Sequence, residues 1–254
     1  MREIILVANW KMYKTISEGL EFIECLKQKI KGKPKVIICS PFTALSNIKE
    51  ALKDNGLELG AQNLFYESEG AFTGEISPVM LKDAGAKYVI IGHSERRCIF
   101  HETNDFINKK VIAAIENNIR PIFCVGEKIE DRRSDLTEMI IRKQILEGLE
   151  NINKDNLENI IIAYEPVWAI GTGLNAKPEE ASEVHRFIRN TLNETYNNKI
   201  GENITILYGG SIKEDNIEGL GKMEEIDGGL VGGASLNCNV FSSIWSKLKT
   251  SKSI

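Results

Sequence analysis

A glutamate at the end of an apolar run is the residue in this sequence best suited to acid–base chemistry. Residues 159–165 are almost wholly apolar and rich in β-branched side chains, which is typical of a strand buried on both faces of a parallel sheet. The strand must stop after Glu165, because Pro166 cannot donate a hydrogen bond to a sheet ladder. Glu165 is therefore a candidate general base; the alternative is a strand-end carboxylate that pairs with a neighbouring Lys or Arg.

The loop that follows Glu165 is unusual for a solvent-exposed connection. It carries three large apolar side chains within residues 167–170, and then Gly171 and Gly173. Such apolar surface needs something to cover, and the glycines let the backbone bend or approach a ligand. We expect an apolar flap that excludes water from Glu165 and so raises the pKa of its carboxyl group. The alternative is a loop that only packs against the protein.

Polar or flexible residues also follow four other strand-like runs. They are Asn9 and Lys11 after the first predicted strand, His93, Ser94 and Glu95 after the fourth, Gly209-Gly210-Ser211 after the seventh and Gly232-Gly233 after the eighth. Taken singly, each has a structural explanation, such as an ion-pairing lysine, a hydrogen-bonded histidine or a tight turn. Their joint occurrence at strand ends is harder to explain by packing and points to one site.

These residue types suit proton transfer on a small phosphorylated hydroxy-carbonyl compound. Glu165 can remove a proton from a carbon next to a carbonyl, while His93 and Asn9 hydrogen-bond the carbonyl oxygen and Lys11 supplies positive charge. Backbone N–H groups at glycine pairs before short helices suit a phosphate group. The candidate residues include no second carboxylate or histidine cluster to hold a metal, and no cofactor fingerprint, so we expect a reaction without metal or cofactor.

Short β-branched runs alternate with longer amphipathic segments along the whole chain. The predicted strands are Glu3–Asn9, Lys35–Ser40, Glu58–Gln62, Tyr88–Gly92, Arg120–Val125, Ile160–Glu165, Thr205–Tyr208 and Gly229–Val231. The clearest predicted helices are Ser17–Ile30, Asn104–Asn117, Ser134–Leu149 and Pro178–Tyr196. This rhythm favours one α/β domain over residues 1–254, a single (β/α)8 TIM barrel with its catalytic residues at the C-terminal strand ends. An open doubly wound sheet, the alternative, would normally have a Gly-rich turn after its first strand, and none follows Asn9.

Composition narrows the possible partners and surroundings. The 254 residues carry a net charge of −4 with a pI near 5.6, which gives no indication of nucleic acid or of an anionic membrane surface. No apolar run reaches the roughly 18 residues of a membrane span, and the N-terminus reads as a strand without a signal peptide. The five cysteines are dispersed, so we expect all of them to be reduced thiols of a cytoplasmic protein and not metal ligands.

Six segments, in collinear order from Asn9 to Leu236, resemble the triosephosphate isomerase family. They are residues 9–12 (NWKM), 70–77 (GAFTGEIS), 92–97 (GHSERR), 163–173 (AYEPVWAIGTG), 208–211 (YGGS) and 230–235 (LVGGAS). The resemblance covers nearly the whole chain. It implies a cofactor-free isomerase that interconverts dihydroxyacetone phosphate and D-glyceraldehyde 3-phosphate through an enediol or enediolate, in glycolysis and gluconeogenesis.

The resemblance also implies roles for individual residues, which are those of the family. Glu165 would be the base and His93 a neutral electrophile, its pKa depressed by the helix start at Ser94 and Glu95. The implied contacts are Asn9 and Lys11 with the substrate, Gly171, Ser211, Gly232 and Gly233 with its phosphate, and Ser94 and Glu95 in support of Lys11 and His93. The flap at residues 167–170 would close over the enediolate and protect its phosphate from loss.

Family members are usually homodimers, and the resemblance places the contact in the segment Gln62–Thr73. That segment is long for a βα connection and carries four large apolar side chains, which a monomer would expose. Departures from the family occur at Tyr13, commonly Asn, at His101, usually Gly, and at Leu174-Asn175-Ala176, commonly Lys-Thr-Ala. Tyr13 lies close to where the partner's loop would dock.

Two other enzyme types and one non-catalytic role are less consistent with the sequence. A Schiff-base aldolase needs a lysine deep on a strand, and the sixth predicted strand has none. A metal-dependent epimerase needs His and Asp ligands that are missing from the predicted strand ends. A barrel kept only as a binding or scaffold protein would be expected to lack a catalytic residue, yet Lys11, His93 and Glu165 are all present.

Overall fold

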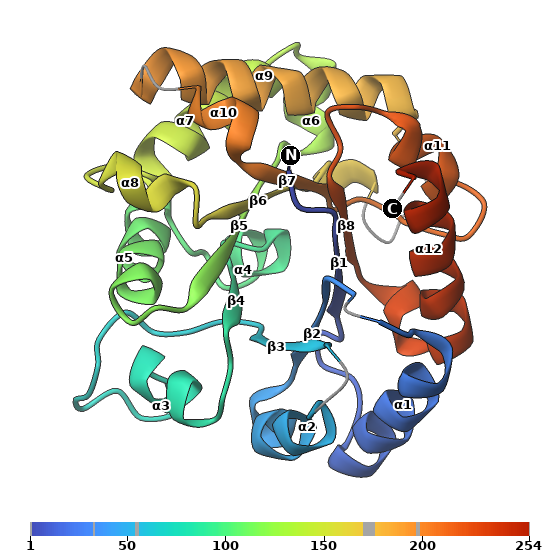
Figure 1. Cartoon of the computed structure of the whole chain (residues 1–254). Coiled ribbons are helices and arrows are strands. Elements are labelled where there is room, and N and C mark those ends of the chain that lie inside the picture. The colour runs from blue at the N-terminus through green and yellow to red at the C-terminus, as the bar shows by residue number, and fades with distance from the viewer. Residues whose placement is uncertain (1, 33, 54–55, 170–175, 197–198, 254) are drawn as a thin grey trace.

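Parallel strands close into a barrel in the computed structural model, which describes residues 2–32, 34–53, 56–169, 176–196 and 199–253 (Figure 1). Within these residues the strands pair in sequence order, and the last one pairs with the first. They are β1 (Ile5–Asn9), β2 (Val36–Ser40), β3 (Glu58–Ala61), β4 (Tyr88–Ile91), β5 (Arg120–Val125), β6 (Ile161–Tyr164), β7 (Thr205–Tyr208) and β8 (Gly228–Val231). The predicted (β/α)8 barrel is confirmed, and each predicted strand is found to within two residues at either end.

Helices between the strands form the outer layer of the barrel. They are α1 (Ile16–Lys29), α2 (Leu45–Ala51), α3 (Pro78–Asp83), α4 (Ser94–Cys98), α5 (Asn104–Glu116), α6 (Ile129–Arg133), α7 (Thr137–Gly148), α8 (Lys154–Leu157), α9 (Pro178–Tyr196), α10 (Ile200–Asn203), α11 (Ile217–Lys222) and α12 (Cys238–Ser251). Short 3-10 turns are η1 (Phe42–Ala44), η2 (Val167–Ala169) and η3 (Gly233–Leu236). Among the residues described, no helix is both long enough and apolar enough to cross a membrane.

Local capping chemistry explains most helix starts, and one predicted start is wrong. Thr15 forms a capping box with Glu18 at the start of α1, and Thr103 accepts a hydrogen bond from the Phe106 N–H at the start of α5. Ser134, predicted to begin a helix, instead follows α6, and α7 begins at Thr137. The N–H of Ser134 bonds back to the Glu130 carbonyl, so this serine ends a short helix.

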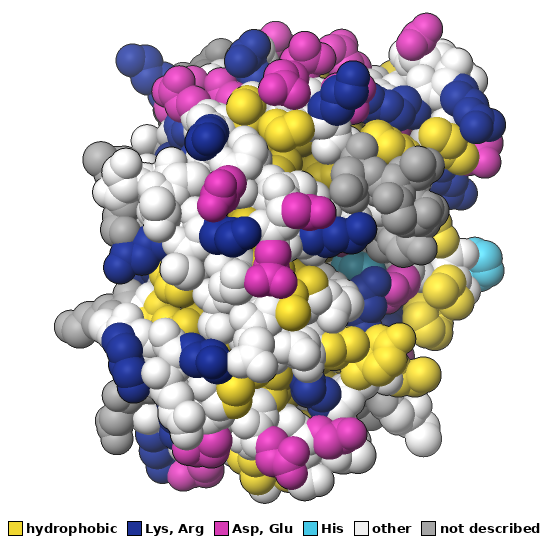
Figure 2. Space-filling model, turned by 90° about the vertical axis from the view of Figure 1, so that its right-hand side faces the viewer, with side chains coloured by type: hydrophobic (Ala, Val, Ile, Leu, Met, Phe, Trp, Pro, Cys, Tyr) yellow, Lys and Arg dark blue, Asp and Glu magenta, His cyan; other side chains and the backbone are white. Residues whose placement is uncertain are grey.

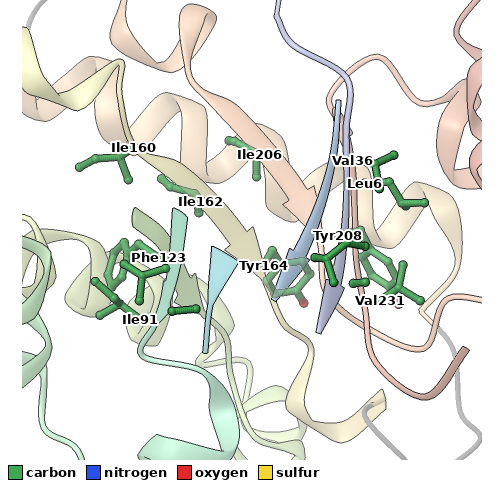
Figure 3. Packing of buried hydrophobic residues seen from close by; sticks show 14 of the residues in the cluster. Leu6, Val36, Ile91, Phe123, Ile160, Ile162, Tyr164, Ile206, Tyr208 and Val231 are labelled. Atoms are coloured by element: carbon green, nitrogen blue, oxygen red, sulfur yellow. The ribbon is translucent and has the colours of Figure 1, made fainter. Parts of the chain in front are cut away.

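Apolar side chains on alternate strand positions form two layers of core. One set fills the inside of the barrel, and Val7, Ile90 and Ala163 belong to it. The other set packs between the strands and the helices, and Figure 3 shows part of it, with Ile162 and Ile206 on neighbouring strands. Because successive strand residues point to opposite faces, runs that are apolar at every position are buried on both sides. Each fully buried side chain of this size contributes about 1.5–3 kcal/mol, so the strand ends are held firmly.

The surface near the barrel's closing seam carries a covalent link. The seam is the pairing of β1 with β8, from Ile5↔Gly228 to Ala8↔Val231. Figure 2 views the face that carries α1 and α12, where acidic and basic side chains are interspersed. Cys25 of α1 and Cys238 of α12 are joined by a disulfide, so the prediction that all cysteines are reduced is wrong for this pair. Dispersed cysteines gave no spacing signal, because the two helices meet only when the barrel closes.

Backbone conformation accounts for one departure from the family. His101, where the family usually has Gly, has a φ angle of 57°, in the left-handed region that glycine adopts without cost. The position therefore favours glycine in any member of the family that keeps this turn. His101 adopts the same conformation at a modest energetic cost.

Candidate active site

A cavity of about 380 Å³ opens at the C-terminal ends of the strands. It is lined by Asn9, Lys11, His93, Glu165, Gly209, Gly210, Ser211, Ile212, Lys213, Leu230, Gly232, Gly233 and Ala234. The structure thus brings seven of the predicted site residues to one cavity. Ser94 and Glu95 lie behind His93 and contact its neighbours, while predicted Gly171 lies outside the described residues.

Glu165 is held by two groups from the end of β4. Its Oε2 accepts a hydrogen bond of 2.8 Å from the Ser94 backbone N–H, and its Oε1 lies 3.0 Å from Nε2 of His93. The carboxylate is only 2% exposed. Because both oxygens are occupied, the side chain must rotate away from Ser94 and His93 before it can act on a substrate in the cavity.

This contact sets the pKa values of both partners, in directions opposite to those expected. Burial alone raises the pKa of Glu165, but His93 and the Ser94 N–H stabilise its charge and hold that pKa below its usual range. Burial alone lowers the pKa of His93, but the adjacent Glu165 carboxylate raises it above its ordinary value. The predicted increase for Glu165 and decrease for His93 are therefore wrong for this arrangement, because each group faces the other.

Hydrogen bonding nevertheless orients His93 as a donor toward the cavity. The Glu95 backbone N–H donates to Nδ1 of His93 over 3.2 Å. When the ring is neutral, this bond keeps Nδ1 unprotonated and places the ring proton on Nε2. When Glu165 moves away, the charge that raises the His93 pKa goes with it, and burial then favours the neutral ring. A neutral imidazole with an Nε2 proton can donate to a carbonyl oxygen.

Lys11 is fixed by the same acidic residue that lies behind His93. Its backbone adopts a left-handed φ of 51°, and its N–H donates to Oδ1 of Asn9 over 3.1 Å. Its ammonium lies 2.5 Å from Oε1 of Glu95. Glu95 therefore contacts Lys11 through its carboxylate and His93 through its backbone. The strained turn persists because these contacts hold it in place.

Two glycine-containing turns, one after β7 and one after β8, form part of the cavity lining. Oδ1 of Asn216 accepts from the Lys213 N–H and Nδ2 of Asn216 donates to the Ser211 carbonyl, which secures the turn after β7. A Cβ at Gly210 would lie 2.2 Å from the Tyr208 hydroxyl, so glycine is required there by packing. After β8, the Ser235 hydroxyl donates to the Gly232 carbonyl over 2.7 Å. These turns leave open, neutral backbone of the kind that receives a phosphate.

A buried glutamate that the sequence analysis did not single out anchors the start of the flap. Glu127, just beyond β5, accepts hydrogen bonds from the Trp168 indole over 2.9 Å and from the Tyr164 hydroxyl over 3.2 Å. The Arg132 guanidinium stacks 4.7 Å from the centre of the Trp168 ring. Burial raises the pKa of Glu127. The only signal of Glu127 in the sequence is its position at a strand end, one residue after Gly126. Residues 170–175, which include the last flap residue and the loop after it, lie outside the described residues.

Lys213 is a second residue that the sequence analysis missed. It lines the mouth of the cavity two residues after Ser211 and is exposed. Across the part of the chain that the structure describes, its ammonium has no carboxylate partner, whereas the Lys11 ammonium is paired with Glu95. The signal in the sequence is its position three residues after the glycine pair. Within the same described ranges, no group of three or more acidic, His or Cys side chains is arranged to hold a metal ion.

The fold and the site together define a (β/α)8 barrel with a carboxylate–imidazole pair facing a glycine-lined cavity. The sequence profile of the family described as triosephosphate isomerase matches residues 4–248. The chain is 53% identical over 246 residues to the triosephosphate isomerase of Dictyoglomus thermophilum, with 96% of this chain and 99% of that protein covered. It is 48% identical to the one from Carboxydothermus hydrogenoformans (96% and 98% covered) and 46% identical to the one from Clostridium tetani (96% and 96%). The chain therefore belongs to the triosephosphate isomerase family, a family of isomerases.

The raised pKa of His93 predicts an acid limb in kcat/KM, which reports on the free enzyme. Below that pKa, His93 is charged and holds Glu165 in an ion pair that the substrate must break. As pH rises through the raised pKa of His93, the imidazole loses its charge and Glu165 is released more easily, so kcat/KM should rise. The measurement is a pH profile corrected for titration of the substrate phosphate, whose second pKa is about 6. A corrected profile that is flat from about pH 6 to 8 would contradict this coupling.

The unpaired Lys213 ammonium should attract an anionic substrate to the cavity. We expect Lys213→Gln to raise KM roughly 3–10-fold at low ionic strength with kcat within about twofold, and the difference should shrink as salt is added. Lys249→Gln is the matched control, because Lys249 is also exposed but lies on α12 and does not line the cavity. Equal KM values for the two variants at low salt would rule out this role.

Proposed function

We propose that this chain interconverts dihydroxyacetone phosphate and D-glyceraldehyde 3-phosphate, with Glu165 as the base. The observation that carries the proposal is the convergence of Glu165, His93 and Lys11 on one cavity that is also lined by glycine turns. A carboxylate base, a neutral donor and a cation are the groups that proton transfer beside a carbonyl requires. The roles given to Glu165 and His93 are those known for this family.

The proposed reaction moves one proton between two carbons. Glu165 rotates away from Ser94 and takes a proton from C1 of dihydroxyacetone phosphate, and the electron pair passes to the C2 carbonyl oxygen. The Nε2 proton of His93 and the ammonium of Lys11 stabilise the charge on that oxygen, and Asn9 helps to hold it. His93 gives its Nε2 proton to the C2 oxygen and takes the proton of the C1 hydroxyl, Glu165 returns the first proton to C2, and the C1 oxygen becomes the aldehyde oxygen of D-glyceraldehyde 3-phosphate. No oxidant, reductant or cofactor is consumed.

We assign the phosphate contacts to Ser211, Gly232 and Gly233 in the turns after β7 and β8, with Gly171 contributing from the flap. Closure of the flap would exclude water while the enediolate exists and so prevent loss of phosphate. The physiological setting that follows is glycolysis and gluconeogenesis, in the cytoplasm, with residues 1–254 acting as one domain.

We further propose that the enzyme is a homodimer joined through Gln62–Thr73. The loop buries more of its apolar surface than expected: Leu64 is fully buried, and the Phe65 ring packs on Tyr66 and on Phe72, each at 4.5 Å between centroids. Phe72 remains 43% exposed at the tip. The loop is therefore a preformed projection and not a loose apolar segment, which lowers the entropic cost of inserting it into a partner.

A second cavity beside the active site is the proposed receiver for that tip. Its volume is about 210 Å³, and it is lined by Asn9, Lys11, Met12, Phe42, Gln62, Asn63, His93, Glu95, Arg96 and Phe100. Met12 is 95% exposed and Phe100 is 61% exposed, so this rim is apolar and open to a partner. An inserted loop would cover Lys11 and His93 from behind and hold them rigid.

Shortening the base tests the catalytic proposal. We expect Glu165→Asp to lower kcat by at least about 100-fold with a much smaller change in KM, because the shorter side chain withdraws the carboxylate from the substrate carbon. The measurement is a coupled assay with D-glyceraldehyde 3-phosphate, run with and without EDTA. Near-normal turnover of this variant would remove Glu165 from the mechanism, and loss of activity with EDTA would point to a metal enzyme.

Replacing Phe72-Thr73 with a shorter polar turn tests the dimer. We expect the variant to be monomeric by light scattering and to lose most of its kcat, because Lys11 and His93 lose the partner's support. Val79→Ser is the control, because Val79 is exposed on α3 but does not line the second cavity. A monomeric loop variant with full kcat would disprove the link to catalysis, and a monomeric wild type would disprove the dimer.

A further inference from the structure

The disulfide between Cys25 and Cys238 joins the two ends of the barrel. The two residues are 213 positions apart in sequence, on helices that lie side by side outside the β1–β8 seam (Figure 1). The strands at this seam are paired over four residues, from Ile5 to Ala8. The bond therefore links the first and last βα units of the chain covalently, beside the seam where their strands pair.

Aromatic packing at the seam holds α1 and α12 against each other next to these two sulfurs. Phe22 of α1 lies 5.2 Å from the Trp10 ring and 6.2 Å from the Phe241 ring of α12, measured between centroids. All three aromatic side chains are buried. The Cα atoms of Cys25 and Cys238 are 6.3 Å apart, which is within the range a disulfide spans without backbone movement.

We propose that Cys25 and Cys238 form a reversible modification site for low-molecular-weight disulfides such as oxidised glutathione. The Cys25 thiolate, the more exposed of the two, attacks one sulfur of oxidised glutathione and displaces one glutathione thiolate. The Cys238 thiolate then attacks the Cys25 sulfur, displaces the second glutathione and leaves the intramolecular bond. The protein dithiol is oxidised and one glutathione disulfide is reduced to two thiols. Reduced glutathione or dithiothreitol reverses both steps.

The second attack is favoured by the position of Cys238. It is the first residue of α12, a helix of 14 residues whose cap, Asn237, accepts hydrogen bonds from the N–H groups of Asn239 and Val240. The positive end of the helix dipole stabilises a thiolate at this position, and a thiolate is the attacking species. The helix N-terminus alone does not make a modification site. The site exists because the Cys25 sulfur lies beside Cys238.

The other cysteines do not share this arrangement. Cys39 and Cys124 are buried inside the barrel, and burial raises the pKa of both thiols, so they are poor nucleophiles. Cys98 is exposed at the end of α4 and is free. Only the pair at the seam combines a second sulfur within reach with at least one accessible thiol. The modification is therefore selective for one of the ten possible pairings.

Closing the seam should stabilise the barrel and leave its chemistry unchanged. A cross-link restricts the unfolded chain more strongly as the loop it closes grows longer, and this loop is nearly the whole protein. Neither cysteine lines the active-site cavity. We expect reduction with dithiothreitol to lower Tm by roughly 5–15 °C and to change kcat/KM by less than about twofold.

The chemical test reduces the wild-type protein with dithiothreitol, removes the reductant, incubates the protein with oxidised glutathione and then counts its thiols. The treated protein is denatured and alkylated, and its peptides are analysed by mass spectrometry. We expect three alkylated residues, Cys39, Cys98 and Cys124, and one cross-linked peptide pair that contains Cys25 and Cys238. Five alkylated cysteines, or glutathione retained on Cys25 without a cross-link, would overturn the proposal.

The stability test compares matched serine variants with and without dithiothreitol. Cys25→Ser should melt at the temperature of the reduced wild type, with no response to dithiothreitol. Cys98→Ser should keep the full response, because that thiol has no partner sulfur. Equal Tm values for the oxidised and reduced wild type would overturn the stabilising role. Neither thiol counts nor Tm values depend on the isomerase assay, so failure of the proposed function would not affect this result.

Discussion

The contact of Glu165 with His93 and Ser94 is the interaction on which the whole site depends. It joins the ends of β6 and β4, which are separated in the barrel by β5. The contact is possible only because the chain beyond β5 is glycine: a Cβ at Gly126 would lie 1.7 Å from the Glu165 carbonyl oxygen. The close approach of three strand ends thus places a base, an imidazole and a helix start within hydrogen-bonding distance.

The acidic side chains of the site lie in two pairs with basic side chains. Glu165 faces His93, and Lys11 faces Glu95, so each of these carboxylates has a basic partner. In the proposed reaction, Glu165 leaves His93 to reach the substrate. The pKa directions of Glu165 and His93 therefore belong to the arrangement in which the two groups face each other.

The same closure that assembles the site also sets its stability. All the strands contribute to one ring, so the positions of residues at the active-site mouth depend on the pairing of β1 with β8. Lys11 follows β1, and Gly232 and Gly233 follow β8, so the two ends of the chain meet at the cavity, where a Cβ at Gly232 would lie 3.3 Å from the Lys11 side chain. Aromatic packing among Trp10, Phe22 and Phe241, with the adjacent disulfide, reinforces this seam from outside.

Local pattern in the sequence was sufficient to predict the strands, the barrel and the residues at its mouth. Short runs apolar on both faces define buried parallel strands, and Pro166 and the glycine pairs mark where they end, so the order of elements and the positions of Lys11, His93 and Glu165 follow from neighbours along the chain. Only the tertiary structure decided the pKa directions of Glu165 and His93, the anchoring of Trp168 by Glu127, the position of Lys213 and the pairing of Cys25 with Cys238. These depend on distances between residues that are tens to hundreds of positions apart. Those distances are set by closure of the barrel, and no local periodicity or composition records them.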